Sequence, residues 1–336
     1  MPIVNDRQYR QMLTAAVAKR SRVVQDIVYK STPLTRILKS SGRIKTKRAG
    51  GPELRIPIEF DKLDVQWFTG YDKLEITPKE LLNSAVFNWS RVVSMFSLNG
   101  TEMLYTSGEE EQIDLMEFYL NAAEKSIKEG WEAALVADGT GDGGRQMIGL
   151  NGAIPIVTNT GVYGGIDRAS VPNWRTTTYD IPEGDVSGFD EWTSVTARPI
   201  LEKVALARSR NGKYPDLAIA DVNSYQAISA SLVAHQRITS QRSANLGFES
   251  LGVWTPAGLI DVVAAGGIGN VMPADTIWLL NTDGLAIYEF PGQSFVPFHP
   301  GDGIRPINQD AWAQGIVWSG QFVVENPLHQ VRLITA

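Results

Sequence analysis

Three histidines, His235, His299 and His329, are the residues of this chain best suited to acid–base chemistry or metal binding. They lie far apart, and none stands at the short spacing from a second ligand that zinc sites use. The chain has no cysteine, so disulfides and thiolate chemistry are not available, which fits a reducing compartment. We therefore expect the histidines to be structural or exposed, and we predict no metal site.

Residues 138–145 read Asp-Gly-Thr-Gly-Asp-Gly-Gly-Arg and contain a G-x-G-x-x-G pattern. A dinucleotide-binding loop of this type follows a strand and opens a helix, whereas this segment follows a predicted helix. Asp138 and Asp142 also resemble the start of a calcium-binding loop, but Gly149 stands where the bidentate glutamate should be. We predict a plain turn here and no cofactor.

Nucleophilic and phosphate-binding signatures are missing as well. The sequence contains neither the G-x-S-x-G nucleophile elbow nor the G-x-x-x-x-G-K-[ST] phosphate loop. Its 37 acidic residues must form some carboxylate pairs, but nothing selects one pair as a catalytic acid and base. We predict no catalytic residue and no enzyme activity, with an acidic soluble α/β hydrolase as an alternative.

The element around which the other segments are organised is a long helix predicted over residues 109–137. At about 1.5 Å per residue, roughly 28 helical residues would span about 42 Å. Apolar residues recur there every three or four positions, which places them on one face of a helix opposite a charged face. This predicted core face is Ile113, Met116, Leu120, Ala123, Ile127, Trp131 and Ala134. Glu109–Glu111 begin the helix, where its dipole favours acidic residues.

Positive charge is concentrated at the N-terminal end. Residues 1–50 contain twelve Lys/Arg and two Asp/Glu, a net charge of +10, whereas residues 51–336 contain 19 basic and 35 acidic residues, a net charge of −16. A basic arm on an acidic body predicts contact with nucleic acid or with a neighbouring copy. The candidate contact residues of this arm are Arg7, Arg10, Lys19, Arg20, Arg22, Lys45, Lys47 and Arg48.

An extended hairpin is predicted between the arm and the long helix. Residues 53–61 and 85–97 alternate apolar and polar side chains with the period of a strand, and a long irregular tip separates them. A two-stranded ribbon is marginal alone, so its apolar face needs a partner, which we expect to be another subunit. The predicted contact residues are Leu54, Ile56, Ile58, Phe60, Trp67 and Tyr71.

The helices and strands predicted for the rest of the chain indicate a mixed α+β fold. A helix is expected over 7–30 and a basic linker over 40–51. A second long helix is expected over 190–210, where Pro199 either kinks it or opens its main part. Loops are expected over 236–258 and 289–311. Other strands are predicted over 217–220, 260–264, 276–280, 285–290, 315–324 and 330–335, with a helix over 222–235 capped by Asp221.

In this order the parts resemble the major capsid proteins of tailed bacteriophages, which have the Hong Kong 97-like fold. The resemblance covers nearly the whole chain. It is carried by the order of elements and by four short strings: Asn88-Trp89-Ser90, Thr106-Ser107-Gly108, Gly149-Leu150-Asn151-Gly152 and Ile166-Asp167-Arg168-Ala169-Ser170-Val171-Pro172-Asn173-Trp174-Arg175.

The resemblance implies four structural parts. Residues 1–50 would be the N-terminal arm, and 51–100 the extended β-hairpin loop. A peripheral domain would take 101–212 and 289–336, including the long helix as a spine. A compact axial α/β domain would take 213–288.

The resemblance also implies a function. Hexamers and pentamers of the chain would form the icosahedral head of a virion around double-stranded DNA, contacted non-specifically, after assembly in the host cytoplasm. A portal and a separate scaffolding protein would be partners, since no scaffolding segment of about a hundred residues precedes the arm; decoration proteins stay open, and no covalent cross-link is assumed. An encapsulin-like compartment is the alternative. No apolar run reaches the roughly 18 residues of a membrane helix, so no membrane contact is expected.

Overall fold

The computed structural model describes residues 23–30, 32–47, 51–59, 65–74, 82–99, 101, 109–233, 250–265, 272–298 and 311–336. The chain combines helices and sheets, as the predicted α+β class requires, and it divides into two compact units. Unit 1 comprises Met1–Arg48, Trp89–Gly149 and Ala286–Phe322. Unit 2 comprises Ala49–Asn88, Leu150–Leu285 and Val323–Ala336.

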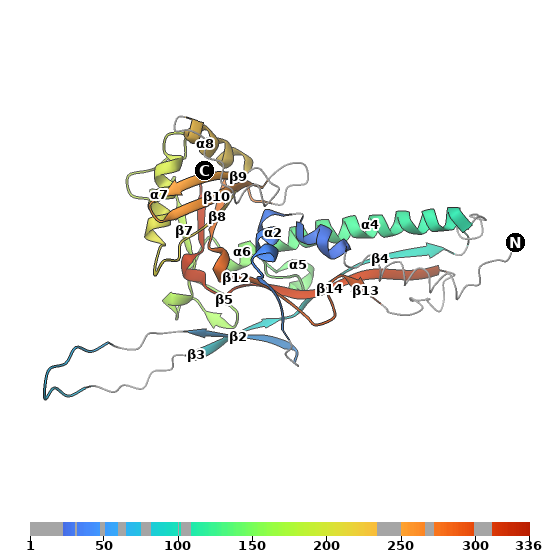
Figure 1. Ribbon diagram of the computed structural model, residues 1–336, viewed down its shortest axis with the longest axis horizontal. Coiled ribbons are helices and arrows are strands. Elements are labelled where there is room, and N and C mark those ends of the chain that lie inside the picture. Colours follow the sequence, from blue (N-terminus) through green and yellow to red (C-terminus); the bar gives the residue numbers. More distant parts are fainter. Residues whose placement is uncertain are drawn as a thin grey trace. The chain divides into compact units, whose positions relative to one another are not determined.

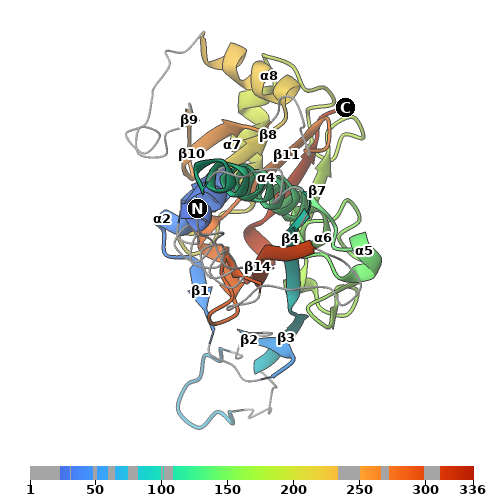
Figure 2. The same ribbon diagram turned by 90° about the vertical axis from the view of Figure 1, so that its right-hand side faces the viewer.

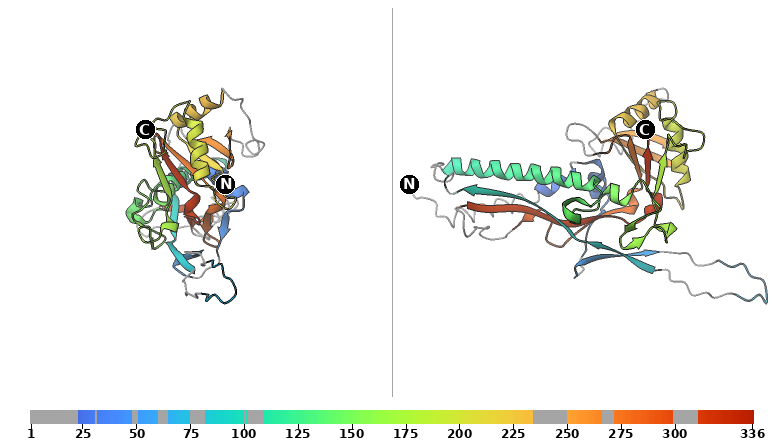
Figure 3. Two further views of the ribbon diagram at one scale, coloured as in Figure 1. Left: turned by 90° about the vertical axis from the view of Figure 1, so that its left-hand side faces the viewer. Right: turned by 180° about the vertical axis from the view of Figure 1, so that it is seen from behind.

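Unit 1 consists of a long helix on a sheet. Strand β14 (Ala311–Val324) is antiparallel both to β4 (Ser90–Asn99) and to β13 (Val296–Pro297), while β1 (Ile44–Thr46) is parallel to β12 (Leu285–Glu289). Figures 1 and 3 show helix α4 running along β4 and β14. The predicted basic linker 40–51 therefore contains a strand, because β1 pairs its backbone with β12.

Helix α4 (Glu109–Val136) confirms the predicted spine. Leu120, Ala123, Ile127 and Trp131 are buried along one face, as their spacing predicts, whereas the side chains of Ile113 and Met116 lie outside the described residues. After the helix, Gly139 has φ +88°, and a Cβ on Gly149 would overlap the carbonyl oxygens of Ala134 and Leu135. The chain can therefore turn back against the end of the helix only because these positions are glycine.

Two helical segments lie beside α4 in Figures 1 and 2: residues 23–30 and α2 (Pro33–Ser40). Thr32 caps α2, because its hydroxyl accepts a hydrogen bond from the Thr35 backbone N–H, and Pro33 occupies the first turn. Residues 7–22 of the predicted 7–30 helix lie outside the described residues.

The strand predicted over 85–97 is in fact two strands. β3 (Leu82–Asn88) pairs antiparallel with β2 (Glu53–Glu59), and β4 pairs with β14, with a break at Trp89 between them. The break changes which alternate residues face inward. Phe87 is buried in β3, but in β4 the buried positions are Ser90, Phe96 and Leu98, while Val93 and Met95 are exposed.

Unit 2 is built on a six-stranded sheet with the order β7-β15-β11-β8-β10-β9. Its strands are β7 (Thr177–Asp180), β8 (Leu217–Ala220), β9 (Ser250–Thr255), β10 (Gly258–Ala264), β11 (Thr276–Leu280) and β15 (Val331–Ile334). Two helices belong to it: α7 (Ala197–Ala207) and α8 (Val222–Val233). Short elements complete the described chain: α5 (Gly141–Gly144) in unit 1, and α6 (Leu150–Ala153), β5 (Val162–Tyr163), β6 (Ile166–Asp167), η1 (Pro172–Trp174), η2 (Thr282–Gly284) and η3 (Pro327–His329) in unit 2.

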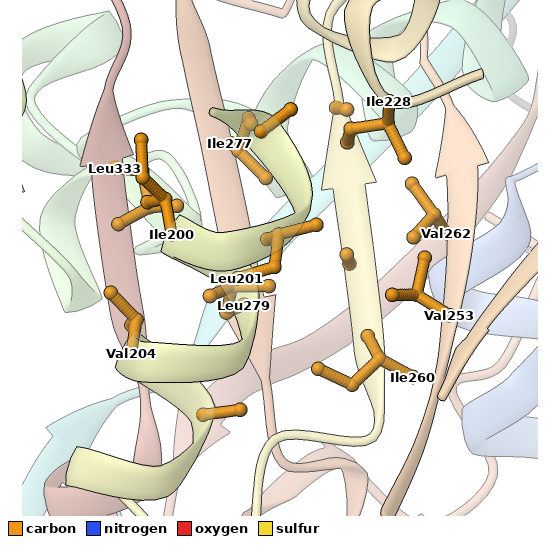
Figure 4. Packing of buried hydrophobic residues seen from close by; sticks show 14 of the residues in the cluster. Ile200, Leu201, Val204, Ile228, Val253, Ile260, Val262, Ile277, Leu279 and Leu333 are labelled. Atoms are coloured by element: carbon orange, nitrogen blue, oxygen red, sulfur yellow. The ribbon is translucent and has the colours of Figure 1, made fainter. Parts of the chain in front are cut away.

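The core of unit 2 lies between α7, α8 and this sheet. Figure 4 shows Leu201 and Val204 of α7 turned toward Leu279 and Leu333 of the strands, and all four side chains are buried. Asp221 caps α8 as predicted, accepting a hydrogen bond of 3.2 Å from the Ser224 N–H.

Some predicted boundaries in unit 2 differ from the structure. The second long helix begins at Ala197, so Pro199 lies in its first turn, where proline is tolerated. The predicted loop 236–258 contains β9. The sheet also includes β7 and β15, which the prediction placed in the peripheral domain, while β12 belongs to the sheet of unit 1. Which sheet a strand joins depends on hydrogen bonds to strands distant in the sequence, and local sequence patterns do not report those partners.

Two leucines of α7 provide a matched test of this packing. Leu201 is 0% exposed and Leu206 is 49% exposed. Leu201→Ala should lower the free energy of unfolding by about 2–5 kcal/mol, because it leaves a cavity in the core of unit 2. Leu206→Ala changes helix propensity in the same way but should have a much smaller effect. Urea unfolding followed by circular dichroism measures both, and equal losses would contradict the assigned core face.

Candidate functional site

The most exposed apolar group of the described chain lies in residues 65–74. Trp67 is 96% exposed and Tyr71 is 106% exposed, and Val65, Phe68 and Leu74 are exposed too. The segment has an ordered turn, since the Asp72 N–H donates to the Thr69 carbonyl (3.2 Å) and the Asp72 carboxylate accepts from the Thr69 N–H (2.9 Å). Large aromatic side chains held on a defined turn and left in water are typical of a surface that contacts another molecule.

The strands preceding and following this segment are already covered within unit 2. Leu54 pairs with Phe87 and Ile56 with Ala85 across β2 and β3, so the four side chains share one face. That face packs on the Tyr163–Gly164 turn, where the Phe87 and Tyr163 rings lie 5.1 Å apart and the Val86 N–H donates to the Gly164 carbonyl. A Cβ on Gly164 would lie 2.7 Å from the Phe87 ring.

This packing narrows the predicted contact set. Leu54 and Ile56 are buried inside their own chain, so they have no apolar surface left for a neighbour. Ile58 is half-buried, and Phe60 lies outside the described residues. Trp67 and Tyr71 remain as the accessible members.

Most of the predicted basic arm lies outside the described residues, namely Arg7, Arg10, Lys19, Arg20, Arg22 and Arg48. Lys45 and Lys47 are described, and their ammonium groups lie 5.3 and 5.9 Å from the centre of the Tyr288 ring. These two lysines therefore interact with an aromatic face of their own unit.

Residues 23–30 and 32–40 contribute to the core of unit 1, whereas the prediction took the basic first helix as an arm rather than as part of a core. Val24, Val28 and Tyr29 are buried on one side of the first helical segment, and Leu34, Ile37 and Leu38 are buried in α2. Their three- and four-residue spacing gives each segment an apolar face that packs inward.

A buried polar cluster fastens these helices to the sheet. The Glu289 carboxylate accepts hydrogen bonds from the Tyr29 hydroxyl, from the Trp318 indole N–H (3.1 Å) and from the Ser294 hydroxyl (2.6 Å). Gln25 in turn donates to Ser294 (3.1 Å). Burial raises the pKa of the Tyr29 hydroxyl well above its usual value, and the nearby Glu289 charge acts in the same direction.

Aromatic rings enclose this cluster. The Tyr29 ring meets the rings of Trp131 (5.5 Å) and Phe295 (5.6 Å) edge to face, and Trp131 meets Trp318 in the same way at 5.7 Å. One contact network thus joins the N-terminal helix, α4 and β14. Nothing in the local sequence around Glu289 signals it, because its members are up to 289 positions apart.

No arrangement for metal chemistry is found where the structure describes the chain. His329 is buried, and its Nδ1 lies 2.8 Å from the Arg208 carbonyl oxygen, a structural role that agrees with the prediction. His235 and His299 lie outside the described residues. The glycine-rich segment at 138–145 forms a turn, as predicted. It includes the short α5, in which Asp142 and Gly143 have left-handed backbone angles.

Comparison of whole folds gives similar structures over most of the chain. The cyanophage A-1(L) capsid subunit is 16% identical with a TM-score of 0.63, covering 88% of this chain and 90% of that one. The capsid of a native GTA particle is 11% identical with a TM-score of 0.55, covering 90% of each chain. The capsid of Myoviridae phage XM1 is 11% identical with a TM-score of 0.52, covering 89% of this chain and 92% of that one.

The chain therefore has the fold of tailed-phage major capsid proteins, the Hong Kong 97-like fold expected from the sequence. A scan against protein-family models and a search of curated proteins found no match. Among the helices described, none is both long and apolar enough to cross a membrane.

Tyr29→Phe tests the buried cluster. The substitution keeps the ring contacts but removes one donor to a buried carboxylate, so the free energy of unfolding should fall by about 1–3 kcal/mol. Tyr71→Phe makes the same chemical change on an exposed ring and should leave unfolding in urea unchanged. If Tyr29→Phe unfolds like the wild type, the hydroxyl of Tyr29 does not stabilise unit 1.

Proposed function

We propose that this chain is the major capsid protein of a tailed double-stranded DNA bacteriophage. In this proposal, copies of the chain assemble as hexamers and pentamers into an icosahedral shell. The observation that carries the proposal is the similarity to capsid subunits over about nine-tenths of both chains. Because the sequence identity to these subunits is 16% or less, the similarity lies in the fold and not in particular residues.

The exposed segment 65–74 supports the proposal independently of the comparisons. Trp67 and Tyr71 offer large rings at low cost in conformational entropy, which suits them to anchor an interface. Interfaces of obligate assemblies are large and apolar, so this segment would lie on a neighbouring copy in the shell.

The proposed role is structural and not enzymatic. The fold similarity offers no support for the acidic hydrolase considered from the sequence. The basic N-terminal residues would contact packaged DNA without sequence preference, or a neighbouring copy, and such contacts would weaken with added salt. A portal and a separate scaffolding protein are the proposed partners.

Electron microscopy of the purified full-length chain tests the shell directly. Closed particles of uniform size are expected, and a species that stays monomeric at high concentration would refute the proposal. Extracted nucleic acid distinguishes the two kinds of shell: particles from infected cells should contain double-stranded DNA, whereas particles filled only with protein would favour the encapsulin-like alternative.

The segment 65–74 can be tested by substitution. Trp67→Ser combined with Tyr71→Ser should leave soluble, folded subunits and reduce the particle yield at least about tenfold, because the rings lose their apolar contact with a neighbour. Trp254→Ser removes an exposed tryptophan elsewhere in unit 2 and serves as the control. Sedimentation in a sucrose gradient measures the yield. If the double variant assembles as well as the control, these two rings do not contribute to the interface between subunits.

A further inference from the structure

Unit 2 contains a cavity of about 410 Å³ that the proposed function does not use. Four segments of the unit line it: β2, the turn that includes η1, the connection between α7 and β8, and the segment around η3. Ile58, Trp174 and Leu328 give it an apolar part, while Arg210 and Lys213 bring two positive charges.

The backbone fixes those two charges close together. Arg210 and Lys213 exchange both backbone hydrogen bonds, of 2.9 and 3.0 Å, across the two-residue turn Asn211-Gly212. Asn211 and Gly212 have φ of +53° and +74°, the signature of a type I′ turn. Residues that form such an antiparallel pair direct their side chains to the same face.

Two like charges directly opposite each other are unfavourable unless an anion lies between them. Within the described residues, neither Arg210 nor Lys213 makes an ion pair, and both side chains are exposed. Glu325 also lines the cavity, so its lining carries two positive charges and one negative charge, a net charge of +1. The cavity thus places the cationic hydrogen-bond donors of Arg210 and Lys213 beside apolar and amide groups. The donors suit a carboxylate, and the apolar groups suit a short apolar stem that carries it.

We propose that this cavity binds the carboxylate of an Asp or Glu side chain from a second copy of the chain. The inference rests on the proposed shell, in which copies surround one another. Charge complementarity selects this occupant: residues 51–336 carry 35 acidic and 19 basic residues, so the surface of a neighbour is rich in carboxylates. In the isolated subunit the two cations face water, and in the shell they are neutralised across the subunit boundary.

Zero-length cross-linking of assembled particles tests the contact. A water-soluble carbodiimide activates a carboxylate, and a lysine amine in direct contact then displaces the activating group to form an amide, with net loss of one water. Particles assembled from mixed ¹⁵N-labelled and unlabelled chains should yield Lys213 joined to an Asp or Glu in peptides that pair the two isotopes. The Lys30–Asp26 ion pair, at 3.1 Å within one chain, is an internal positive control that should give no mixed pair.

If the Lys30–Asp26 product forms and Lys213 stays unmodified or couples only within its own chain, the inference is wrong. A wild-type chain that forms no particles at all would instead refute the proposed function, so the two failures are distinguishable.

A charge-removal variant gives a second measurement. Arg210→Ala with Lys213→Ala should reduce the particle yield at physiological salt at least about tenfold, while the melting temperature of the free subunit is unchanged. Lys125→Ala with Lys128→Ala removes the same charge from the spine helix as a matched control. Yields equal to this control would overturn the inference.

Discussion

The burial of one carboxylate, that of Glu289, is the constraint on which unit 1 depends. A buried carboxylate is stable only with enough donors, and here Tyr29, Trp318 and Ser294 each supply one. These donors come from the N-terminal helix, from β14 and from the chain after β12. Satisfying one charge therefore fixes three segments at once, and the rings of Trp131 and Phe295 exclude water around them.

This constraint changes how the N-terminal region is understood. Its net charge suggests an arm that leaves the body of the protein, but residues 23–40 contribute buried side chains to unit 1. The loss of Val28 or Tyr29 would disturb the same core that holds the spine helix. The contact role of the basic residues before position 23 and of Arg48 stays a prediction.

Unit 1 pairs its buried charge within its own core, whereas unit 2 exposes two kinds of surface group that its own described residues do not pair or cover. Trp67 and Tyr71 expose aromatic area to water, and Arg210 and Lys213 place two positive charges on one face. Both are unfavourable in an isolated subunit and favourable against a neighbour with apolar and acidic surface. A chain of this kind is suited to repeated contact with copies of itself, which agrees with the capsid fold.

Local sequence patterns determined the spine helix, strand β2, the cap at Asp221 and the turn at 138–145, because each depends on spacing within about one or two turns of chain. The order of these elements also sufficed to suggest the fold. Tertiary structure alone decided which strands share a sheet, that Phe87 packs on the Tyr163–Gly164 turn, and that Glu289 meets Tyr29. Those outcomes depend on contacts between residues far apart in the chain, and no periodicity in the sequence records which distant partner a buried face or a buried charge will find.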